Sequence, residues 1–195
     1  MIKKYIKFIL LLSLLSITCL CLMACGKDYS DEVYPEYLLE GARDNGFVAS
    51  YRAYFAIENG NVNKISETKY DNLIYKDSDD HYEIVPEEYY SFEINAKTNN
   101  PSDWKYEQNR NNDKMYDTEI LKNQLLDMNV SFWGNIYIHI TKFDEYILIE
   151  VVNMNENNAI LDSKYAIFYN NEMLQMENDI DLSSIRKIYK YNEDK

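Results

Sequence analysis

The sequence of 195 residues contains few of the residues that define several specialised classes of protein. With only 5 Gly and 3 Pro, it cannot form collagen-like or proline-rich repeats. Its 3 Cys are too few for a framework of disulfides, and only 2 His are present as candidate general bases. Basic residues are also scarce, with 20 Lys and Arg against 33 Asp and Glu. The formal net charge of −13 argues against a nucleic-acid partner, which would require a clustered basic face.

Material for a hydrophobic core is abundant by contrast. Hydrophobic residues make up 46% of the chain, including 19 Tyr and 7 Phe, so a folded chain is expected rather than a disordered one. A length of 195 residues favours one domain over two.

The first residues of the chain have the pattern of a targeting signal and not of a folded domain. Lys3, Lys4 and Lys7 precede residues 8–26, which carry no charge, and this order is typical of an export signal. The uncharged stretch ends in Leu22-Met23-Ala24-Cys25-Gly26, with an apolar residue three positions before the cysteine and a small one directly before it. This pattern resembles the lipobox of bacterial lipoprotein precursors.

The resemblance covers the leader alone and implies a processing route for it. In that family a diacylglyceryl group is joined to the cysteine thiol, and a signal peptidase recognises the residues before it and cuts there. Cys25 would then be the lipidated first residue, with Leu22, Met23 and Ala24 as the recognition sequence. The implied partners are the membrane, through the lipid on Cys25, and the export and lipoprotein-processing machinery. An uncleaved signal anchor and a freely secreted protein are the alternatives, because the uncharged stretch is close to the length that spans a bilayer.

The expected organisation is a signal peptide at residues 1–24, a lipidated N-terminus and short tether at 25–34, and a single extracytoplasmic globular domain at 35–195. Removing residues 1–24 takes away three lysines and no acid, so the remaining 171 residues carry a formal charge of −16.

Period-two alternation and turn signals predict a series of hairpins. Residues 47–57 alternate as a half-buried strand does, and Asn59-Gly60 follows as a hairpin turn. Asp117 or Thr118 is expected to cap a helix ending near Met128. Further strands are predicted at 61–66, 81–85, 88–94, 130–141, 146–152, 164–169, 172–176 and 185–191. The expected fold class is α+β, mainly antiparallel sheet with one or two helices, and the alternative is an all-β barrel or sandwich.

Two further structural expectations depend on weaker signals. Residues 35–43 are predicted to form a short helix, because Pro35 suits a first helical turn and Asn45-Gly46 a stop. Phe132 and Trp133 are expected in the core, because they adjoin strongly apolar strands.

No pattern of catalytic or cofactor-binding residues is present. The chain has no G-x-S-x-G elbow, no Walker sequence and no G-x-G-x-x-G, so neither a nucleophilic serine nor a nucleotide cofactor is predicted. His81 and His139 are interpreted as structural strand residues.

The acidic turn around Asp77 is the strongest candidate for a metal site. It spaces acidic residues as an EF-hand does, but Tyr82 stands where glycine is needed and Pro86 interrupts the second half. No metal is therefore predicted, and a cation held by Asp77, Asp79 and Asp80 is kept as the weaker alternative.

Trp104 and Tyr106 are the candidate ligand contacts, because they lie in the polar segment 95–112, where burial is not assured. The alternative is that both side chains fold back over the core. We expect a lipid-anchored envelope domain on the extracytoplasmic face of the cell membrane. Its role would be non-enzymatic, binding a protein, peptide or saccharide or serving an accessory complex. A hydrolase working through carboxylates and a purely structural surface lipoprotein are the alternatives.

The lipid assignment predicts the behaviour of Cys25→Ser. This substitution should leave the precursor uncut or release the protein from membranes, because the acylated thiol is lost. Fractionation of cells followed by mass measurement of the chain tests this. Membrane retention of a cut Cys25→Ser chain would contradict the assignment.

Overall fold

The computed structural model describes residues 34–43, 51–76, 81–109, 114–176, 182 and 185–192. The chain divides into the units Met1–Tyr34 and Pro35–Lys195, and every element described below belongs to the second unit.

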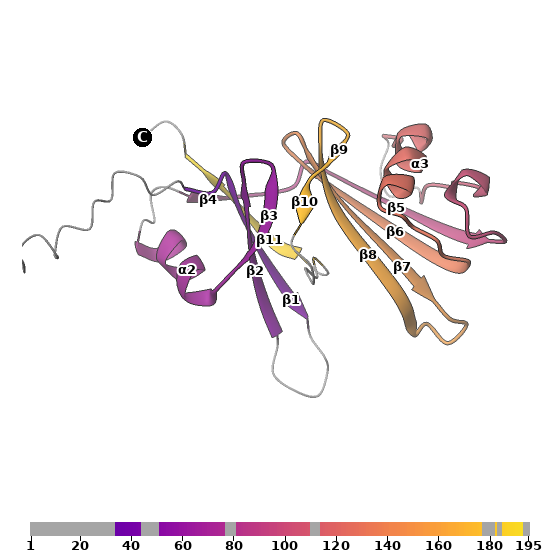
Figure 1. The fold of residues 1–195 in the computed structure, drawn as a ribbon, viewed down its shortest axis with the longest axis horizontal. Helices are drawn as coiled ribbons and strands as arrows, with labels where there is room; N and C mark the ends of the chain where they lie inside the picture. The colour runs from indigo at the N-terminus through magenta and orange to yellow at the C-terminus, as the bar shows by residue number, and fades with distance from the viewer. Residues whose placement is uncertain are drawn as a thin grey trace, which may run out of the picture. The chain divides into compact units, whose positions relative to one another are not determined.

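Six strands form the first sheet, called sheet A, in the order β10-β3-β2-β1-β11-β4. All neighbours are antiparallel except β10 and β3, which run parallel. Figure 1 shows α2 beside this sheet. The elements are β1 (Tyr37–Arg43), β2 (Tyr51–Glu58), β3 (Asn61–Ile65), α2 (Glu67–Asp71), a π-helical turn (Asn72–Lys76), β4 (His81–Ile84), β10 (Gln175–Met176) and β11 (Ile185–Tyr191).

Five strands form the second sheet, called sheet B, as an antiparallel meander in sequence order. In Figure 1 the helix α3 lies on one face of this sheet. The elements are β5 (Glu88–Ala96), a 3₁₀ turn (Pro101–Asp103), α3 (Thr118–Asp127), β6 (Gly134–Phe143), β7 (Tyr146–Met154), β8 (Ile160–Tyr169) and β9 (Glu172–Met173). Both sheets are open, so the α+β prediction is confirmed and the barrel alternative is not formed.

Two of the predicted hairpin turns are confirmed, and asparagine explains both. Asn59 and Gly60 between β2 and β3 have φ of 49° and 73°, and Asn170 and Asn171 between β8 and β9 have φ of 51° and 66°. Two consecutive left-handed residues make the turn whose twist matches that of the flanking strands. Asparagine and glycine enter this conformation at low cost.

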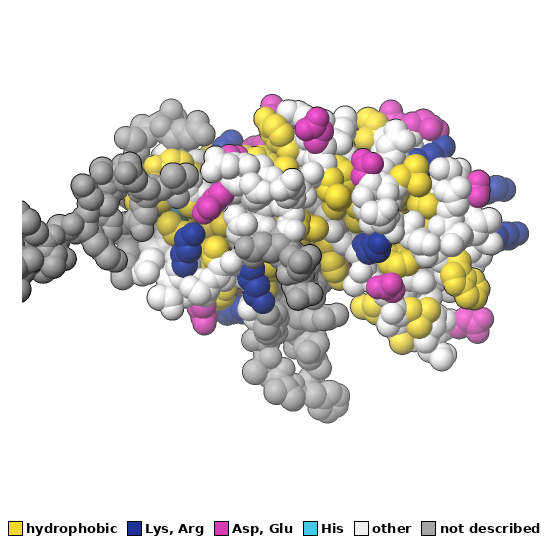
Figure 2. Space-filling view, viewed as in Figure 1, with side chains coloured by type: hydrophobic (Ala, Val, Ile, Leu, Met, Phe, Trp, Pro, Cys, Tyr) yellow, Lys and Arg dark blue, Asp and Glu magenta, His cyan; other side chains and the backbone are white. Residues whose placement is uncertain are grey.

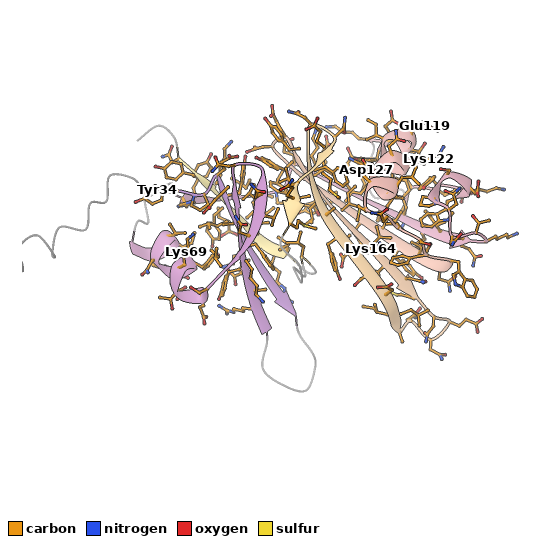
Figure 3. The ribbon with its side chains drawn as sticks, viewed as in Figure 1. Tyr34, Lys69, Glu119, Lys122, Asp127 and Lys164 are labelled. Atoms are coloured by element: carbon orange, nitrogen blue, oxygen red, sulfur yellow. The ribbon has the colours of Figure 1, made fainter. Side chains whose placement is uncertain are left out.

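The predicted helix is α3, and its cap is the predicted Asp117. One carboxylate oxygen of Asp117 accepts hydrogen bonds from the backbone N–H groups of Glu119, at 2.8 Å, and Ile120, at 3.3 Å. At the other end of α3, the Lys164 ammonium of β8 donates to the carbonyl oxygens of Met128 and Asn129 (Figure 3). A carboxylate at the N-terminus and an ammonium at the C-terminus both interact favourably with the helix dipole and stabilise the helix.

The buried hydrophobic residues form two clusters, each packed against one or both of the sheets. The first cluster packs Leu121 and Leu125 of α3, together with Met128 directly after the helix, against sheet B. The second cluster joins the sheets, because it contains Leu39 and Phe55 of sheet A together with residues of sheet B. Its sheet B members include Phe143, Tyr146, Leu148 and Ile167.

The helix predicted over residues 35–43 is wrong, because Tyr37–Arg43 is strand β1. This strand is central in sheet A, with Leu39 opposite Phe55 of β2 on one side and Ile188 of β11 on the other. Backbone pairing with β2 and with the distant β11 therefore overrides the local turn signals.

The prediction of a core position holds for Phe132, which is buried, and is wrong for Trp133, whose exposed fraction is 73%. The two residues precede β6, and in extended chain neighbouring side chains point to opposite faces. Burial of Phe132 under the sheet therefore turns Trp133 to solvent.

Two adjacent leucines of α3 provide a matched test of the first cluster. Leu125 is fully buried, whereas Leu126 is 44% exposed. Leu125→Ala should lower the free energy of unfolding by about 2–5 kcal/mol, because it leaves a cavity, and Leu126→Ala by less than about 1 kcal/mol. Urea unfolding of both variants measures the difference, and equal losses would contradict this packing of α3.

Candidate functional site

A cavity of about 500 Å³ lies at the ends of several strands of both sheets. Its lining combines tyrosine rings, carboxylates and one ammonium group. The lining residues are Glu36, Tyr37, Glu87, Asp144, Glu145, Tyr146, Tyr169, Lys190 and Tyr191. We call this the tyrosine–carboxylate cavity.

The first wall of the cavity comes from sheet A and is fixed by backbone hydrogen bonds. The N–H of Glu36 donates to the carbonyl oxygen of Ile57 at 2.9 Å, and the carbonyl oxygen of Glu36 accepts from Tyr191 at 2.9 Å. Glu36 therefore sits between the ends of β2 and β11, directly before β1. Its carboxylate is presented from a residue that cannot move independently of the sheet.

The second wall comes from sheet B, and its carboxylates lie at a turn and a strand end. Asp144 and Glu145 form the two-residue turn between β6 and β7, where Asp144 has a φ of 48°. Glu87 precedes β5, and its N–H donates to the carbonyl oxygen of Lys142 at 2.9 Å. Paired strands thus hold these three acids at one end of sheet B.

Asp144 is the most strongly bonded acid of the cavity. Its Oδ2 accepts from the Lys190 ammonium at 2.7 Å and from the Tyr37 hydroxyl at 2.5 Å. These two donors, Lys190 first, hold the pKa of Asp144 below its ordinary value. Burial and the hydrogen bond to Asp144 raise the pKa of Tyr37, so its phenol stays protonated as the donor.

Glu36 and Tyr146 form a second pair of the same kind. The Tyr146 hydroxyl donates to Oε2 of Glu36 at 2.8 Å. Burial, followed by this hydrogen bond, raises the pKa of Tyr146. A hydrogen bond to Glu145 likewise raises the pKa of Tyr169. The phenols of Tyr37, Tyr146 and Tyr169 therefore act as hydrogen-bond donors to carboxylates at neutral pH.

The rings of these tyrosines pack on one another. Tyr146 lies with its centroid 4.9 Å from those of both Tyr37 and Tyr169, edge-on to the first and tilted against the second. Phe143 stacks on Tyr146 at 5.6 Å. These contacts give the cavity an aromatic surface next to its acids.

The cavity is electronegative, with four carboxylates and one ammonium in its lining. Among the residues that the structure describes, Lys190 is the only Lys or Arg within 4.0 Å of any of these four carboxylates. Elsewhere, on the face drawn in Figure 2, acidic and basic side chains are interspersed.

The structure places both predicted ligand contacts against the core. Trp104 is 6% exposed, and its indole N–H donates to the carbonyl oxygen of Thr98 at 2.9 Å. The Tyr106 hydroxyl donates to the carbonyl oxygen of Pro101 at 2.8 Å, and its ring packs edge-on against Phe92. Neither residue lines the tyrosine–carboxylate cavity. A partner bound at Trp104 and Tyr106 is not tested by these contacts and stays a prediction.

The other predicted site residues lie outside the described residues. These are the lipidation site Cys25 with Leu22, Met23 and Ala24, and the acidic turn with Asp77, Asp79 and Asp80. His139 is exposed on β6, and His81 is buried with Nε2 3.3 Å from the carbonyl oxygen of Pro35.

The described part of the chain shows neither a metal-binding cluster nor a membrane-spanning helix. No group of three or more His, Cys, Asp or Glu side chains there is arranged to hold a metal ion. Within the same residues, no helix has the length and apolar character needed to cross a membrane.

The residues of the cavity were not singled out by the sequence. They come from five separate segments, and Tyr37 and Asp144 are 107 positions apart. The available signal was compositional, namely 19 Tyr in a chain with 33 acids. Comparison of the chain with protein-family models, curated proteins and solved structures finds no match.

The geometry around Asp144 predicts a pH effect on stability. Because the folded state lowers the pKa of Asp144, its contribution is present above the unfolded pKa of about 3.9 and is lost as the pH falls through the lowered value. Asp144→Asn removes this contribution. The loss of unfolding free energy between pH 6 and pH 3 should therefore be smaller in Asp144→Asn than in the unaltered protein. Urea unfolding at both pH values tests this, and an identical pH dependence would contradict it.

Proposed function

We propose that the protein is a lipid-anchored domain on the extracytoplasmic face of a bacterial cell membrane, and that it binds a small polar ligand without catalysing a reaction. Binding is assigned to the tyrosine–carboxylate cavity. The observation that carries the proposal is the joint presence there of tyrosine rings packed edge-on or tilted against one another and of carboxylates held by hydrogen bonds. Rings provide contact area at low conformational cost, and acids fix the orientation of a polar ligand.

The location rests on the leader of the sequence. Lys3, Lys4 and Lys7, the uncharged stretch and Leu22-Met23-Ala24-Cys25 together match the order of a lipoprotein signal. Two acyl chains on Cys25 would hold the chain at the membrane stably, whereas one would hold it only marginally.

The electrostatics of Asp144 disfavour this residue as the general acid of a hydrolase. A glycoside hydrolase needs one acid that keeps its proton near neutral pH, which requires a raised pKa. Lys190 and Tyr37 lower the pKa of Asp144 instead. This arrangement supports a permanently charged acceptor rather than a general acid.

Substitution at Tyr169 tests the ligand site. Tyr169 is 38% exposed and lines the cavity, whereas Tyr75 is 72% exposed and lies outside its lining. Full-length protein in a nonionic detergent is to be titrated by NMR with glucose, glucosamine and 1,5-diaminopentane. At least one of these probes should bind, and Tyr169→Ala should weaken its binding about fivefold, because a ring contact contributes about 1 kcal/mol.

Tyr75→Ala is the matched control and should bind the same probe as the unaltered protein does. Equal binding by Tyr169→Ala and the unaltered protein would contradict the assignment to this cavity. Failure of all three probes to bind would contradict the proposed function itself.

A further inference from the structure

We infer that the ligand of the tyrosine–carboxylate cavity is a small organic cation, a primary amine that binds as its ammonium ion. This inference rests on the proposed function and names the chemical class of the ligand. It follows from a comparison of two similar arrangements within the cavity, one of which already holds an ammonium group.

The first arrangement is built from Asp144 and Tyr37 and is filled by the chain itself. The Lys190 ammonium lies 2.7 Å from the Asp144 carboxylate and 5.8 Å from the centroid of the Tyr37 ring. A carboxylate at ion-pair distance and a ring within about 6 Å are the two attractions that select an ammonium ion. The Tyr37 hydroxyl completes the arrangement by donating to the same carboxylate.

The second arrangement repeats these parts with Glu36 and Tyr146. The Tyr146 hydroxyl donates to Glu36, as that of Tyr37 does to Asp144. The Tyr146 ring also packs against the rings of Tyr37 and Tyr169, so the two arrangements share aromatic side chains. No Lys or Arg of the described residues forms an ion pair with Glu36. Within the described residues, the second arrangement therefore has a carboxylate and rings like those of the first but no Lys or Arg paired with its carboxylate.

The charges of the remaining lining residues also favour the binding of a cation. Glu87 and Glu145 add two carboxylates that also lack an ion pair with a described Lys or Arg, so the cavity carries a formal excess of three negative charges. An ammonium ion bound beside Glu36 would reduce this excess. A neutral saccharide would meet the rings and hydrogen-bond acceptors but would leave the excess charge unchanged.

Calorimetric titration of the full-length protein in a nonionic detergent at pH 6 separates these ligands. The probes are glucosamine, glucose and 1,5-diaminopentane, with both amines present as ammonium ions. Glucosamine should bind at least about fivefold more tightly than glucose, the effect of one ion pair in a partly solvated cavity. Binding of the diamine as well would indicate that the ammonium group suffices, and binding of glucosamine alone would indicate an amino sugar.

Two substitutions should change amine binding in opposite directions. Glu36→Gln keeps an oxygen acceptor for Tyr146 and removes the charge, so it should weaken glucosamine binding about fivefold and glucose binding by clearly less. Lys190→Met removes the internal cation and should strengthen glucosamine binding by about the same factor.

Lys187→Met is the matched control for Lys190→Met. It removes the same charge from the same strand, but Lys187 faces Glu40 at 3.9 Å and does not line the cavity. Amine binding should therefore be unchanged in Lys187→Met. Thermal unfolding of each variant shows whether the fold is retained, and the opposite signs expected for Glu36→Gln and Lys190→Met are not produced by general destabilisation.

The possible failures of the cation inference and of the proposed function are distinct. Equal binding of glucose and glucosamine, with no effect of Glu36→Gln, would overturn the cation and leave the cavity as a site for a neutral ligand. The absence of binding by all three probes would overturn both. An increase in amine affinity in Lys187→Met equal to that in Lys190→Met would reduce the effect to net charge and overturn the assignment to this cavity.

Discussion

The contact of Tyr37 with Phe143 and Tyr146 is the interaction on which the rest of the structure depends, because it joins the two sheets at one end. The Tyr37 ring lies 5.6 Å from Phe143 and 4.9 Å from Tyr146, edge-on to both. Neither sheet alone contains all the walls of the cavity. The position of every carboxylate relative to the rings therefore follows from how these aromatic side chains pack.

The abundance of tyrosine has a physical role in a chain with so many acids. With 33 Asp and Glu and only 20 Lys and Arg, basic side chains cannot pair with every carboxylate. A phenol buries its ring and donates a hydrogen bond from its tip, and so it satisfies an acid at the border of a core. Among the described residues, such bonds join the pairs Tyr37–Asp144, Tyr54–Glu67, Tyr70–Glu40, Tyr90–Glu88 and Tyr146–Glu36.

The sequence was sufficient to predict the turn and the helix cap whose conformation is determined by residues adjacent in the chain. Asn59-Gly60 and the cap at Asp117 were found because left-handed turns and helix ends have local signals. Strand β1 was mistaken for a helix, because its partners lie in β2 and in β11, near the end of the chain. The cavity was missed for the same reason, since its residues meet only after both sheets have formed. Trp133 was misplaced because apolar neighbours in the sequence do not indicate which face of an extended segment is covered.

The division of the cavity between two sheets has a mechanical consequence. Glu36, Tyr37 and Lys190 come from one sheet, and Asp144, Tyr146 and Tyr169 come from the other. A ligand that contacts both walls stabilises the association of the two sheets, because it is bound only while the sheets remain together. A force that separates the sheets would break the ligand's contacts with one of the two walls. The affinity of the cavity for its ligand would in that case fall when a mechanical force acts between the two sheets.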